Sequence, residues 1–374
     1  MRRVLVLLFT VIAATWMFLV PAGWAKEPAT PELTLNEAVT LAIRQSAALK
    51  KAGLDVDKAE ELRRQAADQL TFTPVRGGSY DPRVEIAWYS LLSADLNWQM
   101  SKRTQNVEED RLVLSTCRKY WDVLKAKEKV RAAEAGVRKA ELALRKTRAL
   151  ARVGMSAPGM SPQVALAGAE AALAGARTGL AAARNELDAA YEGLNQLTGF
   201  WPQYRPVLVD SVEFRPVEVD NLDVHVQRVL ESSPAVWLAN EGVTLAKYAQ
   251  ELMWARGQYT PYKVRQIEVE QAELDAVSAR DAVRLATREL YYSLRSLEAA
   301  HAAALEQVKA AQEALRVTLL AREVGMATAA DVAEREAALA EAEQELFDLA
   351  CQHAYLKLAF QKPWAVSAGG TGSR

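Results

Sequence analysis

The sequence has few of the residue types that usually mark chemistry. Its two cysteines, Cys117 and Cys351, each stand alone in a helical pattern, which predicts small buried side chains rather than a disulfide framework or a metal site. Its three histidines, His225, His301 and His353, are widely separated and have no neighbouring metal ligands. Phosphate-binding loops and nucleophile motifs are also missing. We therefore expect neither an enzyme nor a protein with a cofactor.

An excess of one charge is missing too. The 46 basic and 47 acidic residues of the 374-residue chain give a formal net charge of −1. The two signs alternate along the segments, as they do on solvated helix faces. This balance gives no support to a nucleic-acid partner.

Long apolar runs are limited to the N-terminus, and no later segment is apolar enough to span a bilayer as a helix. The run from Val4 to Val20 follows two arginines and precedes Gly23-Trp24-Ala25. A basic start, an apolar core and small residues before a cut are typical of a secretory signal peptide, here residues 1–25. An uncleaved anchor is the alternative. We expect an exported protein of the cell envelope, in the periplasm or the outer membrane.

What the chain does have is a duplicated helical pattern. The triplet Val153-Gly154-Met155 recurs in the second half of the chain as Val324-Gly325-Met326, and the shift that superimposes the triplets also superimposes Tyr120 on Tyr291. Segments rich in Ala, Leu, Glu and Arg, with apolar residues at helical spacing, surround both triplets. A repeat of this kind has to be recognised before a fold is assigned. We predict an all-α protein made of two long antiparallel helical hairpins in tandem.

The predicted elements follow this repeat. The first helices, which match each other at a larger shift than the triplets do, run from Leu33 to about Leu70 and from Leu222 to about Trp254; the long helices are Ser90–Arg152 and Tyr262–Glu323; the returning helices are Pro162–Leu197 and Asp331–Phe360. The first repeat covers residues 26–198 and the second 221–362. Between them lies a linker, 199–220, with a possible short strand at Val207–Val209, and a disordered tail follows at 363–374.

One passage, from Val84 to Met100, is ambiguous. Its alternate positions are apolar, which is typical of a membrane strand, but its apolar residues from Trp88 onward are also spaced by four. We favour a helix from about Ser90, with at most a short strand before it.

Each Val-Gly-Met triplet marks the turn of a hairpin. Gly154 and Gly325 supply the permissive backbone at the ends of the long helices. Asp331 can cap the returning helix of the second copy. The turn of the first copy is about five residues longer, because Ser156–Pro162 has no full counterpart.

Four motifs resemble those of the TolC-type outer-membrane efflux protein family. They are the opening Leu33–Ala38, the block Lys119–Leu124, the close Leu194–Gly199, and the tip Val324-Gly325 followed by Asp331-Val332. The likeness covers Leu33 to about Lys362. It implies a homotrimer whose hairpins form a hollow periplasmic barrel, joined to a β-barrel of four strands per chain. It also implies an exit duct for drugs or proteins, served by an inner-membrane pump and a periplasmic adaptor.

The sequence departs from this family where the strands belong. The second copy has almost no residues between its first and long helices, so at most one membrane strand per chain is available. Open sheet edges cannot stand in lipid. Either the outer-membrane pore is missing, or another component makes it.

The resemblance also suggests roles at the tip. Asp331 and Glu334 lie where family members place acids that line a narrow entrance, and a trimer would turn them into rings of negative charge. Helix capping by Asp331 is the alternative. The arginine and tyrosine with which the family closes its tip are not matched, because Ala327 and Arg322 stand at those places.

Aromatic residues gather at the opposite end of the predicted hairpins. They are Phe72, Tyr80, Trp88, Tyr89 and Trp98 from the first copy, and Trp254, Tyr259 and Tyr262 from the second. Aromatic belts mark bilayer interfaces, although packing where helices end is the alternative. We expect this end to meet a membrane or a membrane-bound partner.

Two functions therefore remain open. One is a trimeric conduit of an efflux or secretion system. The other is an exported coiled-coil scaffold or adaptor that has kept the helices and lost the pore. A compact trimer would favour the conduit, and a monomer or dimer would favour the scaffold.

Overall fold

The computed structural model describes residues 32–70, 82–155, 161–251 and 261–366, and within these ranges it confirms the all-α prediction. The elements are β1 (Glu32–Leu33), α2 (Leu35–Gln45), α3 (Ala47–Asp68), α4 (Pro82–Arg152), α5 (Pro162–Thr198), β2 (Val207–Leu208), α6 (Leu222–Ser232), α7 (Pro234–Glu251), α8 (Tyr262–Glu323), α9 (Ala329–Gln361) and the 3-10 helix η1 (Pro363–Ala365). The proposed signal peptide and residues 367–374 lie outside the described residues.

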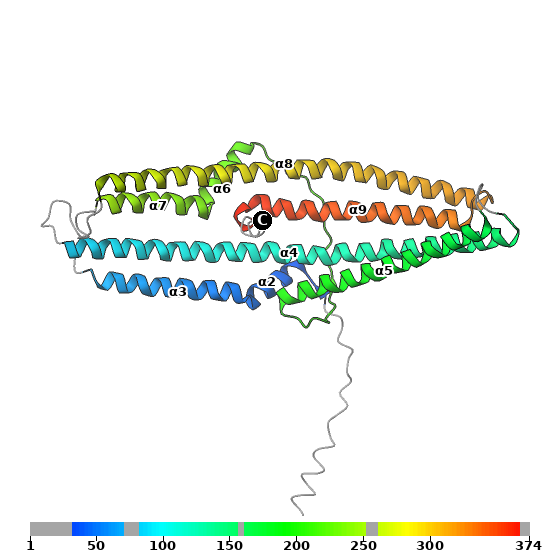
Figure 1. The fold of residues 1–374 in the computed structure, drawn as a ribbon, viewed down its shortest axis with the longest axis horizontal. Helices are drawn as coiled ribbons and strands as arrows, with labels where there is room; N and C mark the ends of the chain where they lie inside the picture. The colour runs from blue at the N-terminus through cyan, green and yellow to red at the C-terminus, as the bar shows by residue number, and fades with distance from the viewer. Residues whose placement is uncertain (1–31, 71–81, 156–160, 252–260, 367–374) are drawn as a thin grey trace, which may run out of the picture.

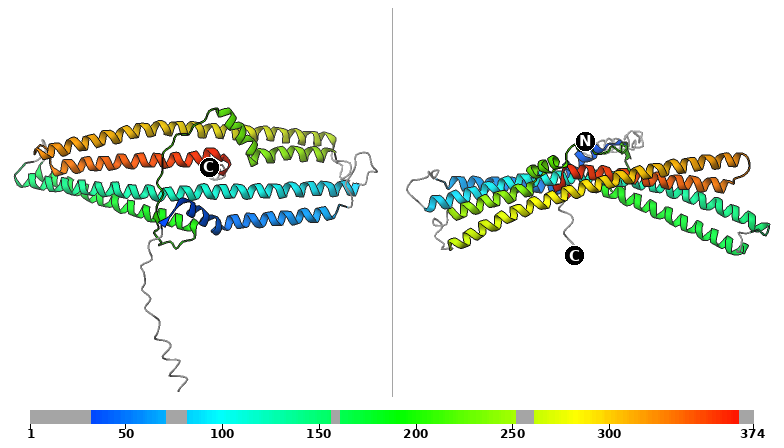
Figure 2. Two further views of the ribbon diagram at one scale, coloured as in Figure 1. Left: turned by 180° about the vertical axis from the view of Figure 1, so that it is seen from behind. Right: turned by 90° about the horizontal axis from the view of Figure 1, so that it is seen from above.

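The helices form one long layer (Figure 1). α4 and α8 run nearly its full length, α5 and α9 return beside them from one end, and α3 and α7 pack beside them at the other. Contacts of α4 with α9 and with α7 join the two hairpins, and Figure 2 shows the layer from behind and from above. At 1.5 Å per residue, the 71-residue α4 is about 107 Å long.

The first helix of each copy is broken, although the sequence pattern predicts it to be continuous. The break falls at Ser46 in the first copy and at Ser233 in the second, which are equivalent positions of the repeat. The Ser46 hydroxyl accepts the backbone N–H of Leu49 at 3.1 Å and so caps α3. Ser233 precedes Pro234, which has no N–H with which to continue a helix.

The ambiguous passage before Ser90 is also helical, because α4 begins at Pro82. Proline is favoured at the first position of a helix. The apolar alternation arises because α4 has neighbours on two sides. Leu92 and Leu96 line a groove shared with Trp237 of α7, whereas Met100 lines one shared with α3.

The linker and the N-terminal strand are held against the middle of α4. β1 and β2 pair in parallel, with Leu33 opposite Leu208. The buried Tyr120 hydroxyl donates to the carbonyl of Leu33 at 3.0 Å and accepts the N–H of Asp210 at 3.2 Å. A single hydroxyl therefore connects α4, β1 and the linker, and the largest apolar cluster surrounds it.

The chain continues to pack beyond Lys362, where the sequence predicts a disordered tail. The indole N–H of Trp364 in η1 donates to Asp110 of α4 at 2.9 Å, and Lys362 forms an ion pair with the same carboxylate. Pro363 and Ala365 are buried. Tail composition gives no sign of this contact, because Asp110 lies far away in the sequence.

Candidate functional site

The two tips have the same helix-end geometry. Gly154 and Gly325 adopt φ of +72° and +78°. At each tip the N–H of the following methionine returns to a carbonyl five residues earlier, from Met155 to Leu150 and from Met326 to Ala321. This is the Schellman arrangement, in which a residue in the left-handed region satisfies the last carbonyls of a helix. Both glycines therefore lie where the sequence predicts a turn.

Asp331 is not the N-cap of α9, since Thr328 occupies that position three residues earlier. The Asp331 carboxylate closes a capping box, because it accepts the N–H and the hydroxyl of Thr328, both at 2.7 Å. It also accepts Lys146 of α4 at 2.8 Å. These contacts, first that with Lys146, hold the pKa of Asp331 well below its ordinary value.

The Lys146–Asp331 pair joins the first hairpin to the second near the tips. A carboxylate that already has three donors attracts a passing cation less than a free one does. Glu334 is exposed and has no hydrogen bond or ion pair within the part of the chain that the structure describes. If acids line an entrance here, Glu334 is therefore the one with a free charge.

Ion pairs fix the register of α4 against α5 and against α9. Glu134 and Glu141 pair with Arg184 and Arg177 of α5, seven residues apart on each helix. On the α9 side, Lys125 pairs with Asp348. A groove of about 490 Å³ lies between these helices, and its charged lining residues are Lys119, Asp122, Lys125, Lys129, Glu186 and Asp348. The polar lining of this groove is suited to water rather than to an apolar ligand.

The structure describes only four of the predicted aromatic residues. Trp88 and Tyr89 are half-buried near the start of α4, and Tyr262 is exposed at the start of α8. Trp98 lies about 24 Å along α4 from Pro82, by helical rise. Lys102 and Arg63 lie over its ring, so Trp98 packs between α3 and α4 away from the end. Phe72, Tyr80, Trp254 and Tyr259 lie outside the described residues.

Two of the histidines come together, contrary to the expectation from their sequence spacing. Phe214 of the linker stacks on His301 of α8, with ring centroids 3.5 Å apart, and lies 4.5 Å from the ring of His353 of α9. His353 is only 2% exposed, and its Nε2 lies 3.4 Å from Glu298. Burial lowers the pKa of both histidines. The Phe214 ring, which no helical pattern highlights, brings them together.

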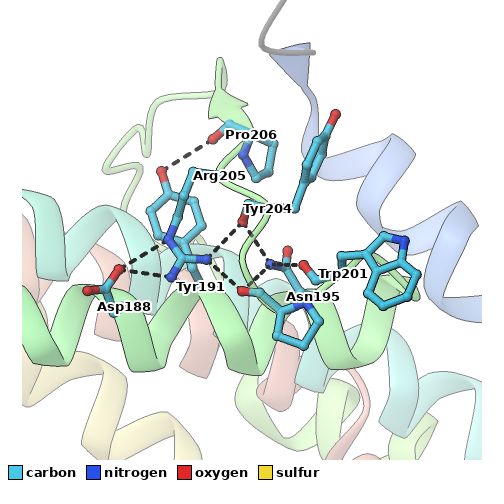
Figure 3. Close-up of polar contacts among 8 residues, drawn as sticks. Asp188, Tyr191, Asn195, Trp201, Tyr204, Arg205 and Pro206 are labelled. Carbon is cyan, nitrogen blue, oxygen red and sulfur yellow. Dashed lines mark hydrogen bonds and ion pairs between the residues drawn. The ribbon is translucent and has the colours of Figure 1, made fainter. Parts of the chain in front are cut away.

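Asn195 organises the start of the linker (Figure 3). Its side-chain amide donates to the carbonyls of Trp201 and Tyr204, at 3.0 and 2.8 Å, while Arg205 pairs with Asp188. Asn195 belongs to the Leu-Asn-Gln-Leu-Thr-Gly motif, so the motif marks a turn-forming residue. The turn leaves the Trp201 side chain 84% exposed.

Within the described ranges, no helix is both long enough and apolar enough to cross a membrane. No protein-family model and no curated protein matches the chain.

Solved structures do match it. The outer membrane channel CmeC of Campylobacter jejuni is 13% identical, over 87% of this chain and 85% of that chain, with a TM-score of 0.65. The outer membrane channel MtrE of Neisseria gonorrhoeae is 16% identical over 88% of each chain, with a TM-score of 0.62. The outer membrane protein VceC of Vibrio cholerae is 14% identical over 89% and 95%, with a TM-score of 0.61. The chain therefore has the fold of the TolC-type outer-membrane channels.

Proposed function

We propose that this protein is one subunit of a ring-shaped conduit of the cell envelope, of the efflux or secretion type. The observation that supports it best is an exposed apolar stripe on α8. Its members are Ile267, Leu274, Leu285 and Tyr292. Successive members lie about two, three and two helical turns apart, so they return to the same side of the α-helix. A long exposed apolar stripe on a water-facing helix is typical of an interface.

The duplication indicates what covers this stripe. The counterparts of Leu285 and Tyr292 in α4 are Leu114 and Trp121, which are 6% and 8% exposed, whereas Leu285 and Tyr292 are both 60% exposed. Leu114 is buried because it packs with Ala359 and Ala365 near the end of the second hairpin. The first hairpin thus uses this face to contact the second, and the second hairpin has the same face free.

A second copy of the chain can cover the free face with its own first hairpin. Such a contact joins two different surfaces, so each added copy presents a new free face until a ring closes. Three copies are what the family resemblance implies, with the adaptor and pump near the tips and the aromatic end at a membrane or a membrane-bound partner. The scaffold alternative needs no ring.

Light scattering on the mature protein tests the ring. We expect a mass of three chains, and a monomer after Leu285→Asp combined with Tyr292→Asp, because each aspartate would place a charge in the buried contact. Leu305→Asp is the matched control, since Leu305 is an exposed apolar residue on a different side of α8. A monomer or dimer for the unaltered protein would instead support the scaffold.

A further inference from the structure

Three arginines form a column on one side of α4. Arg131, Arg138 and Arg145 follow one another at seven-residue intervals, or about 10.5 Å, and all three are exposed. Arg138 lies about five full turns of helix after Tyr120, so the column continues the side of α4 that holds β1 and the linker. It lies on the opposite side from Lys129, which lines the charged groove described above.

Most of this positive charge has no partner. Arg131 pairs with Glu128 and Glu343, both at 3.3 Å. Among the described residues, Arg138 and Arg145 make no ion pair or hydrogen bond. The acids of α4 in this region, Glu134 and Glu141, are directed to arginines of α5 instead.

The second hairpin provides an internal comparison, because its counterparts are neutralised. Lys309 corresponds to Arg138 and pairs with Glu306 at 2.7 Å, and Arg316 corresponds to Arg145 and pairs with Glu313 at 2.6 Å. In α4 the positions three residues before Arg138 and Arg145 hold Ala135 and Leu142, which cannot neutralise them. Within the described ranges, the column of the first hairpin therefore holds two free guanidinium groups, at Arg138 and Arg145, where the second hairpin has two neutralised side chains.

A groove of about 270 Å³ runs beside the column. Ala135, Leu315, Leu339 and Ala340 give it an apolar floor, and Arg131 and Arg138 stand on its α4 side. Glu336 on the α9 side is the one acid that faces the groove without an ion pair among the residues that the structure describes.

We propose that this arginine column is a docking surface for an acidic α-helix of a partner protein. A helix that lies along α4 repeats its side chains every seven residues, so glutamates at that spacing meet successive arginines while its apolar residues cover the groove floor. Guanidinium groups bind carboxylates in this planar geometry better than ammonium groups do. The proposal predicts one such helix on the first hairpin of each subunit and none on the second.

This inference rests on the proposed function in one respect, because the column has to face outward in the ring. The strands and the linker lie on the same side of α4 as the column. A ring with that side inward would have them in its bore, so the outward orientation is the one compatible with a conduit.

Calorimetric titration with a designed helical hairpin that carries Glu at every seventh exposed position tests the proposal. We expect the mature protein to bind it, and Arg138→Gln combined with Arg145→Gln to weaken binding by about five- to tenfold, as the loss of two exposed pairs implies. Lys309→Gln combined with Arg316→Gln, the matched change in the second hairpin, should alter binding less than twofold. Glu336→Gln should strengthen it.

Other results would overturn the proposal. Equal weakening by both double variants, or equal binding of a hairpin with the same glutamates in scrambled positions, would mean that only general charge attraction is at work. Loss of binding to phosphatidylglycerol vesicles in the first-hairpin variant, with no binding of the hairpin probe, would assign the column to lipid. Light scattering of each sample gives its oligomeric state separately. Failure of the ring to form therefore does not decide the docking proposal, because a monomer can still be titrated with the helical hairpin.

Discussion

At the scale of single residues, the two tip glycines have similar surroundings and a demanding backbone. A Cβ atom at Gly325 would meet nothing within 4 Å, so any cost of a substitution comes from its φ of +78°. We expect Gly325→Ala to destabilise the protein by about 1 kcal/mol, and Gly136→Ala, inside α4 in open space, to stabilise it by about 0.5–1 kcal/mol. Urea unfolding of both variants checks this. If the urea midpoints of Gly325→Ala and Gly136→Ala were equal, the backbone at Gly325 would not be strained.

Asp331 makes two kinds of contact, which contribute different amounts to the free energy of unfolding. Loss of a capping interaction, here the contacts of Asp331 with Thr328, costs about 1 kcal/mol, whereas an exposed ion pair contributes about 0.2–1 kcal/mol. The Asp331 side chain is 38% exposed, so solvent screens its contact with Lys146. We expect Asp331→Ala, which removes both contacts, to lower the unfolding midpoint more than Lys146→Met, which removes only the ion pair. Equal losses in the two variants would mean that the contact between the hairpins dominates.

The pair of histidines makes stability depend on pH. Burial first, and for His301 the neighbouring His353, keeps their folded-state pKa values below the ordinary 6.5. The unfolded chain therefore binds more protons than the folded one in mildly acidic solution. Stability should be fully present above pH 6.5 and decline as the pH falls through the lowered pKa values.

Glu298 also makes the protein less stable as the pH falls, but in a lower pH range than the histidines do. Although burial opposes it, the N–H of Val217 and the Arg295 side chain keep its pKa below the ordinary value. Urea midpoints measured between about pH 7.5 and about pH 5.5 isolate the histidines, because a carboxyl group titrates below this window. His301→Phe, which preserves a ring against Phe214, should reduce the decline. An unchanged slope would exclude His301.

At the scale of the elements, Tyr120 and its counterpart Tyr291 should differ in importance. The Tyr120 hydroxyl bonds both Leu33 and Asp210 in a buried site, whereas the Tyr291 hydroxyl accepts a hydrogen bond from Arg295 in an exposed one. Tyr120→Phe leaves the part-buried N–H of Asp210 without its acceptor and removes one of the two donors to the Leu33 carbonyl, which costs about 1–3 kcal/mol. Tyr291→Phe should change stability by less than about 0.5 kcal/mol. Thermal unfolding of the two variants tests the contrast, which similar losses would contradict.

The long elements could be predicted from sequence because local signals end them. Glycines close α4 and α8, and a proline opens α5, so those ends agree with the pattern to within a residue or two. Ser46 could not be identified as a break, because serine is common inside predicted helices. Thr328 and Asp331 are both good caps, and only the backbone decides between them. The approach of His301 to His353 depends on a linker ring from a distant part of the chain.

At the scale of the whole molecule, length and mass should respond differently to the α8 variants. The layer is about as long as α4, about 107 Å, and a ring of upright subunits is no longer than one of them. Small-angle scattering of the Leu285→Asp, Tyr292→Asp variant should show the mass of one chain with an almost unchanged maximum dimension. A dimension that falls with the mass would mean that the subunits join end to end.

The contact between η1 and α4 has a consequence for how the chain is made. Lys362 and Asp110, which form an ion pair there, are 252 residues apart. At a synthesis rate of about 5–20 residues per second, about 12–50 s separate the appearance of the two partners. During that interval the first hairpin can fold on itself, but the side of α4 that carries Leu114 remains uncovered. A newly made chain therefore exposes an apolar edge for most of its synthesis, when chaperones are most needed, and a chain cut short before α9 lacks most of the residues that cover this edge.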